Sequence, residues 1–145
     1  VLGAADEREK IGVPCFGPEK KAAIIEGSKV FAKNLMKKYG IPTAAYETFR
    51  DLPSALAYLG TCPVPVVVKA DGLALGKGVI VAQTREEAIA AARSMMEDKV
   101  FGESGASVVI EEFLEGPEVS VLSAKRSFPW SPPWITNART TATKG

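Results

Sequence analysis

A glycine-rich loop between two apolar segments constrains the fold of this chain more than any other feature. Residues 64–70 are dominated by valine, and residues 79–82 are also largely β-branched, which predicts two strands. The intervening residues 71–78 contain three glycines, which is typical of a loop. The loop therefore joins one strand to another strand, and the first strand is apolar enough to be buried.

The spacing of apolar residues predicts the other helices and strands. The predicted helices are residues 20–25, 29–39, 52–59 and 84–98, and the predicted further strands are residues 43–49, 107–113 and 118–122. The first sixteen residues are predicted to be the end of a helix followed by a short strand at residues 11–16, whose partners are expected outside this sequence. We expect Ser28 and Thr84 to cap the second and the fourth helix. From residue 64 onward the order is strand, strand, helix, strand, strand. This order predicts an α+β fold in which helices pack on a small, mainly antiparallel sheet.

The residue inventory excludes several classes of protein. The 145 residues suit about one domain, and the absence of histidine excludes a Ser-His-Asp triad and histidine metal ligands. The two cysteines are widely spaced and no leader-like segment opens the chain, so we expect a reduced, cytoplasmic protein. No apolar run approaches the roughly 20 residues that a membrane helix needs. We therefore expect no membrane partner.

The net charge of +1 hides an uneven distribution. Residues 123–145 carry four basic and no acidic side chains, so the residues before them have 14 basic and 17 acidic ones and a charge of −3. This balance disfavours a nucleic-acid surface on the folded part. A nucleic-acid binder that acts through the tail alone is one alternative, and it would give only weak, salt-sensitive attraction.

Lys69 is the first candidate binding residue. By strand alternation it lies on the same face as Val67, so its ammonium group ends a strand that is otherwise suited to burial. A buried ammonium group needs an anionic partner, and a phosphate would serve. The alternative is a lysine at a sheet edge whose amine reaches water.

The loop itself is the second candidate. Glycines at 72, 76 and 78 would let backbone N–H groups approach an anion, and Lys77 would add positive charge. A P-loop is excluded because the glycine spacing is one residue short, no Ser or Thr follows Lys77, and no helix follows the loop. The remaining interpretations are a hairpin tip that folds over nucleotide phosphates and an ordinary long hairpin.

Residues 111–118 are the third candidate. A strand that ends in Glu111 and Glu112 and continues into a turn would offer main-chain groups to an adenine edge and a carboxylate to a ribose. The alternative is a solvated strand end.

Five motifs in order resemble the phosphoribosylamine–glycine ligase family, the glycinamide ribonucleotide synthetases of purine biosynthesis. They are FGP at 16–18, EGSK at 26–29 with FAK at 31–33, GIPT at 40–43, VKADGLA at 68–74 with GKGVIV at 76–81, and IEEFL at 110–114. The resemblance covers residues 1–122, and five motifs in order are far more specific than one. It implies an ATP-grasp fold and the ligation of glycine to 5-phosphoribosylamine through a glycyl phosphate.

The resemblance also implies roles for individual residues. Lys29 and Lys69 would hold the ATP phosphates, while Gly72, Gly76, Lys77 and Gly78 would belong to a lid over them. The expected adenine hinge includes Glu111, Phe113 and Leu114, and Glu118 would contact the ribose. The expected partners are the small molecules ATP, glycine and 5-phosphoribosylamine, and no nucleic acid. Mg²⁺ is the expected cofactor, with ligands outside this chain.

The predicted organisation has three parts. Residues 1–16 would end an N-terminal domain, residues 17–122 would form the nucleotide-binding part of an ATP-grasp domain, and residues 123–145 depart from the family pattern. If residues from 129 onward are translated back into codons and read two bases out of phase, the codons permit the segment that the family has at this position. We therefore interpret the tail as the product of a frameshift. The alternative is a genuine tail rich in proline and tryptophan.

We accordingly expect a truncated synthetase that forms no glycinamide ribonucleotide alone. Two other functions stay open: another ATP-grasp carboxylate–amine ligase, and a nucleotide-binding fragment that performs no chemistry.

Overall fold

The computed structural model describes residues 3–74, 78–98, 100–121 and 140–141. The chain divides into two compact units, Val1–Phe113 and Leu114–Gly145, which are described separately.

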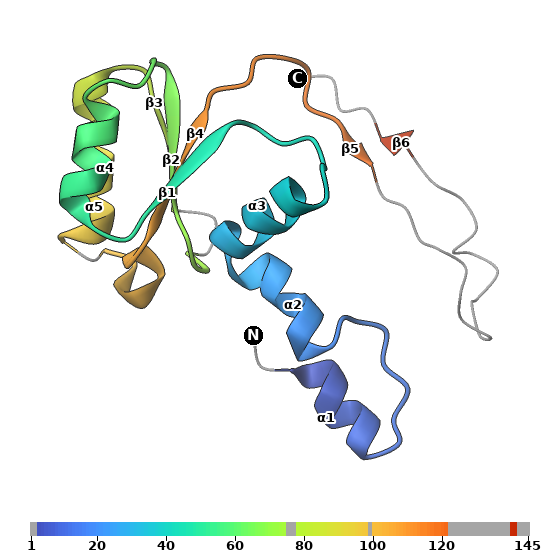
Figure 1. The fold of residues 1–145 in the computed structure, drawn as a ribbon. Coiled ribbons are helices and arrows are strands. Elements are labelled where there is room, and N and C mark those ends of the chain that lie inside the picture. Colours follow the sequence, from blue (N-terminus) through green and yellow to red (C-terminus); the bar gives the residue numbers. More distant parts are fainter. Residues whose placement is uncertain (1–2, 75–77, 99, 122–139, 142–145) are drawn as a thin grey trace. The chain divides into compact units, whose positions relative to one another are not determined.

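The first unit contains the predicted α+β elements (Figure 1). Its helices are α1 (Ala4–Lys10), α2 (Lys20–Gly27), α3 (Lys29–Lys38), α4 (Leu52–Leu59), α5 (Arg85–Met96) and the short 3-10 helix η1 (Gly102–Gly105). Its strands are β1 (Tyr46–Phe49), β2 (Val66–Ala70), β3 (Val79–Ala82) and β4 (Val108–Glu112). Residues 11–16 lie outside every described helix and strand, and because the strand predicted there needs partners from outside this sequence, it stays a prediction.

The four strands form one sheet in the order β1-β4-β2-β3, and every neighbouring pair is antiparallel. The predicted strand–loop–strand unit is confirmed, since β2 pairs directly with β3. In this register Lys69 lies between Val79 and Val109, and Val67 lies between Val81 and Glu111. Residues directly opposite each other point to the same face, so the pairing decides which side chains share a surface.

Helices α4 and α5 cover one face of the sheet, which we call the helix-covered face (Figure 1). Alternation along β2 sends Val66, Val68 and Ala70 into this layer, where all three are buried. Alanines on α5, including Ala88 and Ala92, let the helix approach the strands closely. The main hydrophobic core therefore lies on this face.

Side-chain caps fix the beginnings of three helices. The Ser28 hydroxyl accepts a hydrogen bond from the Phe31 amide of α3 at 3.0 Å, and the Thr84 hydroxyl accepts one from Glu87 of α5 at 3.2 Å. Both predicted caps are confirmed. Asp51 caps α4 in the same way.

In the second unit, β5 (Ser120–Val121) pairs antiparallel with β6 (Thr140–Thr141). The strand predicted at residues 118–122 is thus present in shorter form, and it pairs with a segment for which no strand was predicted. Residues 122–139 lie outside the described residues, so the frameshift interpretation and the predicted domain boundaries stay predictions. Within the part of the chain that the structure describes, no helix combines the length and apolar character needed to cross a bilayer.

Candidate functional site

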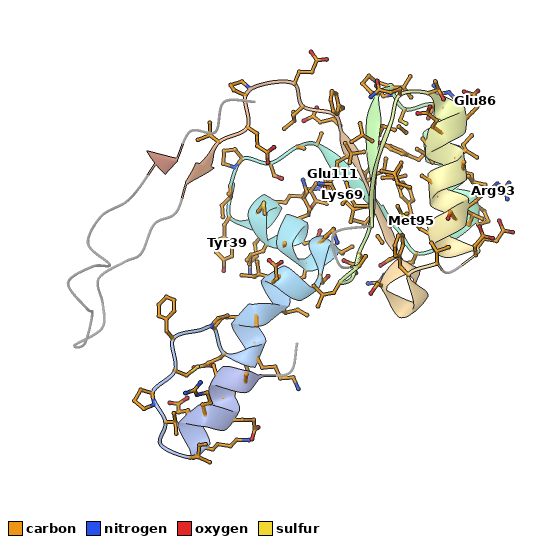
Figure 2. All side chains as sticks on the ribbon, turned by 180° about the vertical axis from the view of Figure 1, so that it is seen from behind. Tyr39, Lys69, Glu86, Arg93, Met95 and Glu111 are labelled. Carbon is orange, nitrogen blue, oxygen red and sulfur yellow. The ribbon has the colours of Figure 1, made fainter. Side chains whose placement is uncertain are left out.

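The candidate site begins on the sheet face opposite α4 and α5, which we call the Lys69 face. Strand register places Val67, Lys69, Glu111 and their direct partners on this face. Figure 2 shows Lys69 and Glu111 together on the side of the sheet away from α5. Helix α3 reaches the same face through Lys33, whose ammonium nitrogen lies 3.0 Å from a Glu111 carboxylate oxygen.

Glu111 holds two ammonium groups on one oxygen. Its Oε2 lies 3.0 Å from Lys33 Nζ and 2.9 Å from Lys69 Nζ. The side chains of Glu111 and Lys33 are only 6% and 10% exposed, which makes mutual charge compensation necessary. Two lysines and one glutamate leave this ion triad, Lys33–Glu111–Lys69, with a net charge of +1.

Lys69 is the member of the ion triad that can still bind a ligand. Its side chain is 27% exposed, and among the described residues its ammonium contacts only Glu111. An ammonium group has three donors, so two remain for an anion. Because β2 lies between β4 and β3, the alternative of a lysine at a sheet edge is wrong.

Lys29 lies one helical turn before Lys33, so both side chains leave α3 on the same side. The Lys29 ammonium donates hydrogen bonds to the carbonyl oxygens of Gly72 at 3.0 Å and Asp71 at 3.5 Å. Lys33 meanwhile shares Glu111 with Lys69. These contacts bring Lys29 and Lys69 to the same side of the fold, around the start of the glycine-rich loop.

Asp71 connects that loop to the start of α3. Its Oδ1 accepts hydrogen bonds from the Val30 amide at 2.8 Å and the Ser28 hydroxyl at 2.9 Å. Its Oδ2 accepts one from the Ser107 hydroxyl at 3.2 Å, just before β4. A carboxylate is favourable at a helix N-terminus, so Asp71 fixes the loop relative to Lys29. The sequence alone did not predict this role, because an aspartate after a strand also suits a turn.

Two glycines of the loop, Gly72 and Gly78, have packing roles in this structure. A Cβ atom at Gly72 would lie 2.8 Å from the Ser104 Cα, and the Gly72 amide donates to the Ser104 carbonyl at 3.1 Å. A Cβ atom at Gly78 would lie 2.5 Å from that of Ala74. Close packing thus explains both glycines, and their contact with a nucleotide stays a prediction. Gly76 and Lys77 lie outside the described residues.

A cavity of about 460 Å³ opens beside the loop. Its lining residues come from α2, the start of the loop and η1: Lys20, Ile24, Gly27, Asp71, Gly72, Leu73 and Ser104. The cavity could not be predicted from the sequence, because α2 and η1 are distant in the chain.

The predicted adenine and ribose contacts are divided between the two units. Glu111 and the half-buried Phe113 belong to the first unit, whereas Leu114 and Glu118 belong to the second and are exposed. The structure therefore brings Lys69 and Glu111 into contact and places Lys29 at the start of the glycine-rich loop, and the hinge and ribose roles stay predictions. Among the described residues, no group of three or more carboxylate, cysteine or histidine side chains is placed to hold a metal ion.

Comparison with known proteins links this site to a family. Residues 27–127 match the family model described as the phosphoribosylglycinamide synthetase ATP-grasp (A) domain. A Streptococcus pneumoniae protein named phosphoribosylamine–glycine ligase is 55% identical over 121 residues, which are 83% of this chain. The chain spans only 29% of the length of that curated relative.

Two solved structures are similar to the chain. The crystal structure of phosphoribosylamine–glycine ligase from Thermotoga maritima has a TM-score of 0.68 and 42% identity, over 73% of this chain and 27% of that one. The biotin carboxylase domain of Hydrogenobacter thermophilus 2-oxoglutarate carboxylase, solved with ADP, its magnesium salt and bicarbonate, has a TM-score of 0.61 and 24% identity. This second match covers 77% of this chain and 25% of the other, and it shows the fold alone.

Proposed function

The chain belongs to the phosphoribosylglycinamide synthetase ATP-grasp (A) domain family, and from this premise we propose that it is the nucleotide-binding part of a phosphoribosylamine–glycine ligase. Such a ligase consumes ATP, glycine and 5-phosphoribosylamine in the cytoplasm and gives glycinamide ribonucleotide, ADP and phosphate. The name of the relatives supports the reaction. The observation that carries the nucleotide assignment is the pair of cations, Lys29 and Lys69, on one side of the fold.

The phosphates of ATP bind the two lysines in this proposal. Lys69 has donors to spare among the described residues, and the ion triad around it carries net positive charge. Lys29 is the first residue of α3 and lies beside the start of the glycine-rich loop. Its ammonium exchanges the carbonyl oxygens of Asp71 and Gly72 for phosphate oxygens when the nucleotide binds.

The base of ATP packs against apolar side chains next to Lys69. Val79 and Val81 are 43% and 44% exposed, and both share the Lys69 face because they pair with Lys69 and Val67. A nucleotide has an apolar base and an anionic tail, and this face offers valines beside ammonium groups. The main chain of residues 111–114 supplies the adenine hinge, and Glu118 supplies the ribose contact.

In the proposed reaction, a carboxylate oxygen of glycine bonds to the γ-phosphorus while the bond from that phosphorus to the ADP oxygen breaks. The amine of 5-phosphoribosylamine then attacks the carbonyl carbon of glycyl phosphate, loses a proton and displaces phosphate. This chain holds the phosphates and offsets their charge, because phosphoryl transfer depends mainly on positioning and electrostatics. The described residues offer no carboxylate set suited to Mg²⁺, so no step is assigned to that ion.

The test is a calorimetric titration of the 145-residue chain with ATP. We expect saturable binding that Lys69→Met weakens by about tenfold or more, the effect of losing one charge-assisted contact. Lys38→Met is the matched control, since Lys38 is an exposed lysine at the end of α3 that contacts the Tyr39 ring. Its affinity should equal that of the unmodified chain.

Two results would overturn the proposal. One is a chain that is folded by circular dichroism but does not bind ATP. The other is a folded Lys69→Met variant whose ATP affinity is unchanged.

A further inference from the structure

Lys33 is a buried charged residue that the nucleotide site described above does not use directly. It lies in the middle of α3 and is buried. Its ammonium contacts Glu111 at 3.0 Å, the Thr43 hydroxyl at 2.7 Å and the Ala44 carbonyl at 3.4 Å. These three acceptors use all three of its donors, so Lys33 has none left for a ligand.

The charge of Lys33 nevertheless changes what Lys69 can do. Without Lys33, Glu111 and Lys69 would form a neutral ion pair with little net attraction for a polyphosphate. A second ammonium on the same Glu111 oxygen brings the ion triad to +1. Because Glu111 is buried, the interaction between these charges is screened less than it would be in water.

Lys33 also restrains the carboxylate that orients Lys69. Helix α3 and the segment after it hold the Lys33 ammonium through Thr43 and Ala44, and that ammonium holds Glu111 Oε2. The same oxygen receives Lys69 at 2.9 Å. The position of the Lys69 ammonium on the sheet face therefore depends on an element that is remote from β2 in the sequence.

We propose that Lys33 is a positioning residue for polyphosphate binding: it offsets the charge of Glu111 and aims Lys69 at the phosphates. This inference rests on the proposed function, since it names the residue that tunes the same site. A purely structural Lys33 would support the fold without distinguishing a charged ligand from an uncharged one.

The experiment compares ATP with adenosine, which lacks phosphates, on the 145-residue chain and on Lys33→Met. We expect Lys33→Met to bind ATP about tenfold more weakly, as for a lost charge-assisted contact, and adenosine with unchanged affinity. Calorimetry measures ATP binding and ligand-observed NMR measures adenosine binding. Lys37→Met, an exposed lysine of the same helix, is the control and should bind both ligands normally.

A charge-balanced variant keeps the inference testable if Lys33→Met does not fold. In the double variant Lys33→Met with Glu111→Gln, both buried charges are gone, Lys69 keeps its own, and the amide oxygen at position 111 still accepts a hydrogen bond from Lys69, so ATP affinity should return to within about threefold of the starting value. Lys33→Arg preserves the charge and should also bind ATP.

Four outcomes separate the possibilities. If Lys33→Met is folded and binds ATP normally, or loses ATP and adenosine affinity equally, the inference is wrong. A folded double variant that stays tenfold weaker for ATP also overturns it. If the unmodified chain is folded but does not bind ATP, the proposed function itself fails.

Discussion

The two faces of the four-stranded sheet use the same strands for different purposes. Consecutive β2 residues show the contrast, since Val68 is fully buried under α4 and α5 whereas Lys69 keeps donors for a ligand on the other side. Among the described residues, the only buried charged side chains are Lys33 and Glu111, and both belong to the Lys69 face. Apolar burial on one face thus provides a rigid support on which the other face can hold unneutralised positive charge.

The largest expected effect is a loss of stability when a core residue on the helix-covered face is truncated. Leu59 of α4 is fully buried in the core, so Leu59→Ala should lower the free energy of unfolding by about 2–5 kcal/mol through lost burial and a cavity. Urea unfolding followed by circular dichroism measures this loss. Leu73→Ala is the control, because the exposed Leu73 should cost no more than about 0.5 kcal/mol. Equal losses in the two variants would contradict the assignment of the core to this face.

The second-largest expected effect is a loss of stability at the junction between the Lys69 face and α3, which the hydrogen bonds of Asp71 hold together. Asp71→Ala leaves the Val30 amide and two hydroxyl groups without their acceptor, so we expect about 2 kcal/mol lower stability, as for lost hydrogen bonds to a charged group. Amide exchange at Val30 should also accelerate, which NMR measures directly. ATP affinity should fall too, because the loop that meets Lys29 is released.

Asp71→Asn sharpens this test. An amide oxygen can still accept from the Val30 N–H, so its loss of stability should be smaller than that of Asp71→Ala. Unchanged stability and unchanged Val30 exchange in Asp71→Ala would show that the junction does not hold the loop.

Local sequence signals were sufficient for much of this fold. The valine run predicted β2, the glycines predicted the loop, and the hydroxyl groups of Ser28 and Thr84 predicted two helix starts. Each of these signals depends on neighbours within a few residues. Alternation along one strand was also enough to separate Lys69 from the buried valines.

Long-range partners left no comparable signal. Lys33 follows Lys29 in a lysine-rich helix, a pattern typical of a solvated surface, and only the pairing of β2 with β4 brings Glu111 between two lysines. The strand predicted at residues 11–16 likewise rests on local apolar residues alone, and among the described residues no strand lies beside it. Individual residues report the propensity for an element, whereas the tertiary fold decides which elements meet.

The smallest expected effect is a pH dependence of the melting temperature, which comes from Asp51 at the start of α4 on the helix-covered side. Hydrogen bonds from the side chain and backbone amide of Ser54 hold the pKa of the exposed Asp51 below its ordinary value of 3.8. Because the folded-state pKa is the lower one, this cap stabilises α4 fully above that ordinary value, and the contribution is lost as the pH falls through the lowered pKa. The melting temperatures of the chain and of Asp51→Ala should therefore differ at pH 6 and converge toward pH 3.

Asp51→Asn isolates the charge in this comparison. Asparagine also caps helices but does not titrate, so its melting temperature should carry no pH dependence from this position. ATP binding at neutral pH should be the same in all three proteins, because Asp51 lies before α4 and contacts neither Lys29 nor Lys69 among the described interactions. A difference between the chain and Asp51→Ala that stays constant from pH 6 to pH 3 would contradict the assignment. Weaker ATP binding in either variant would show that the two faces are coupled.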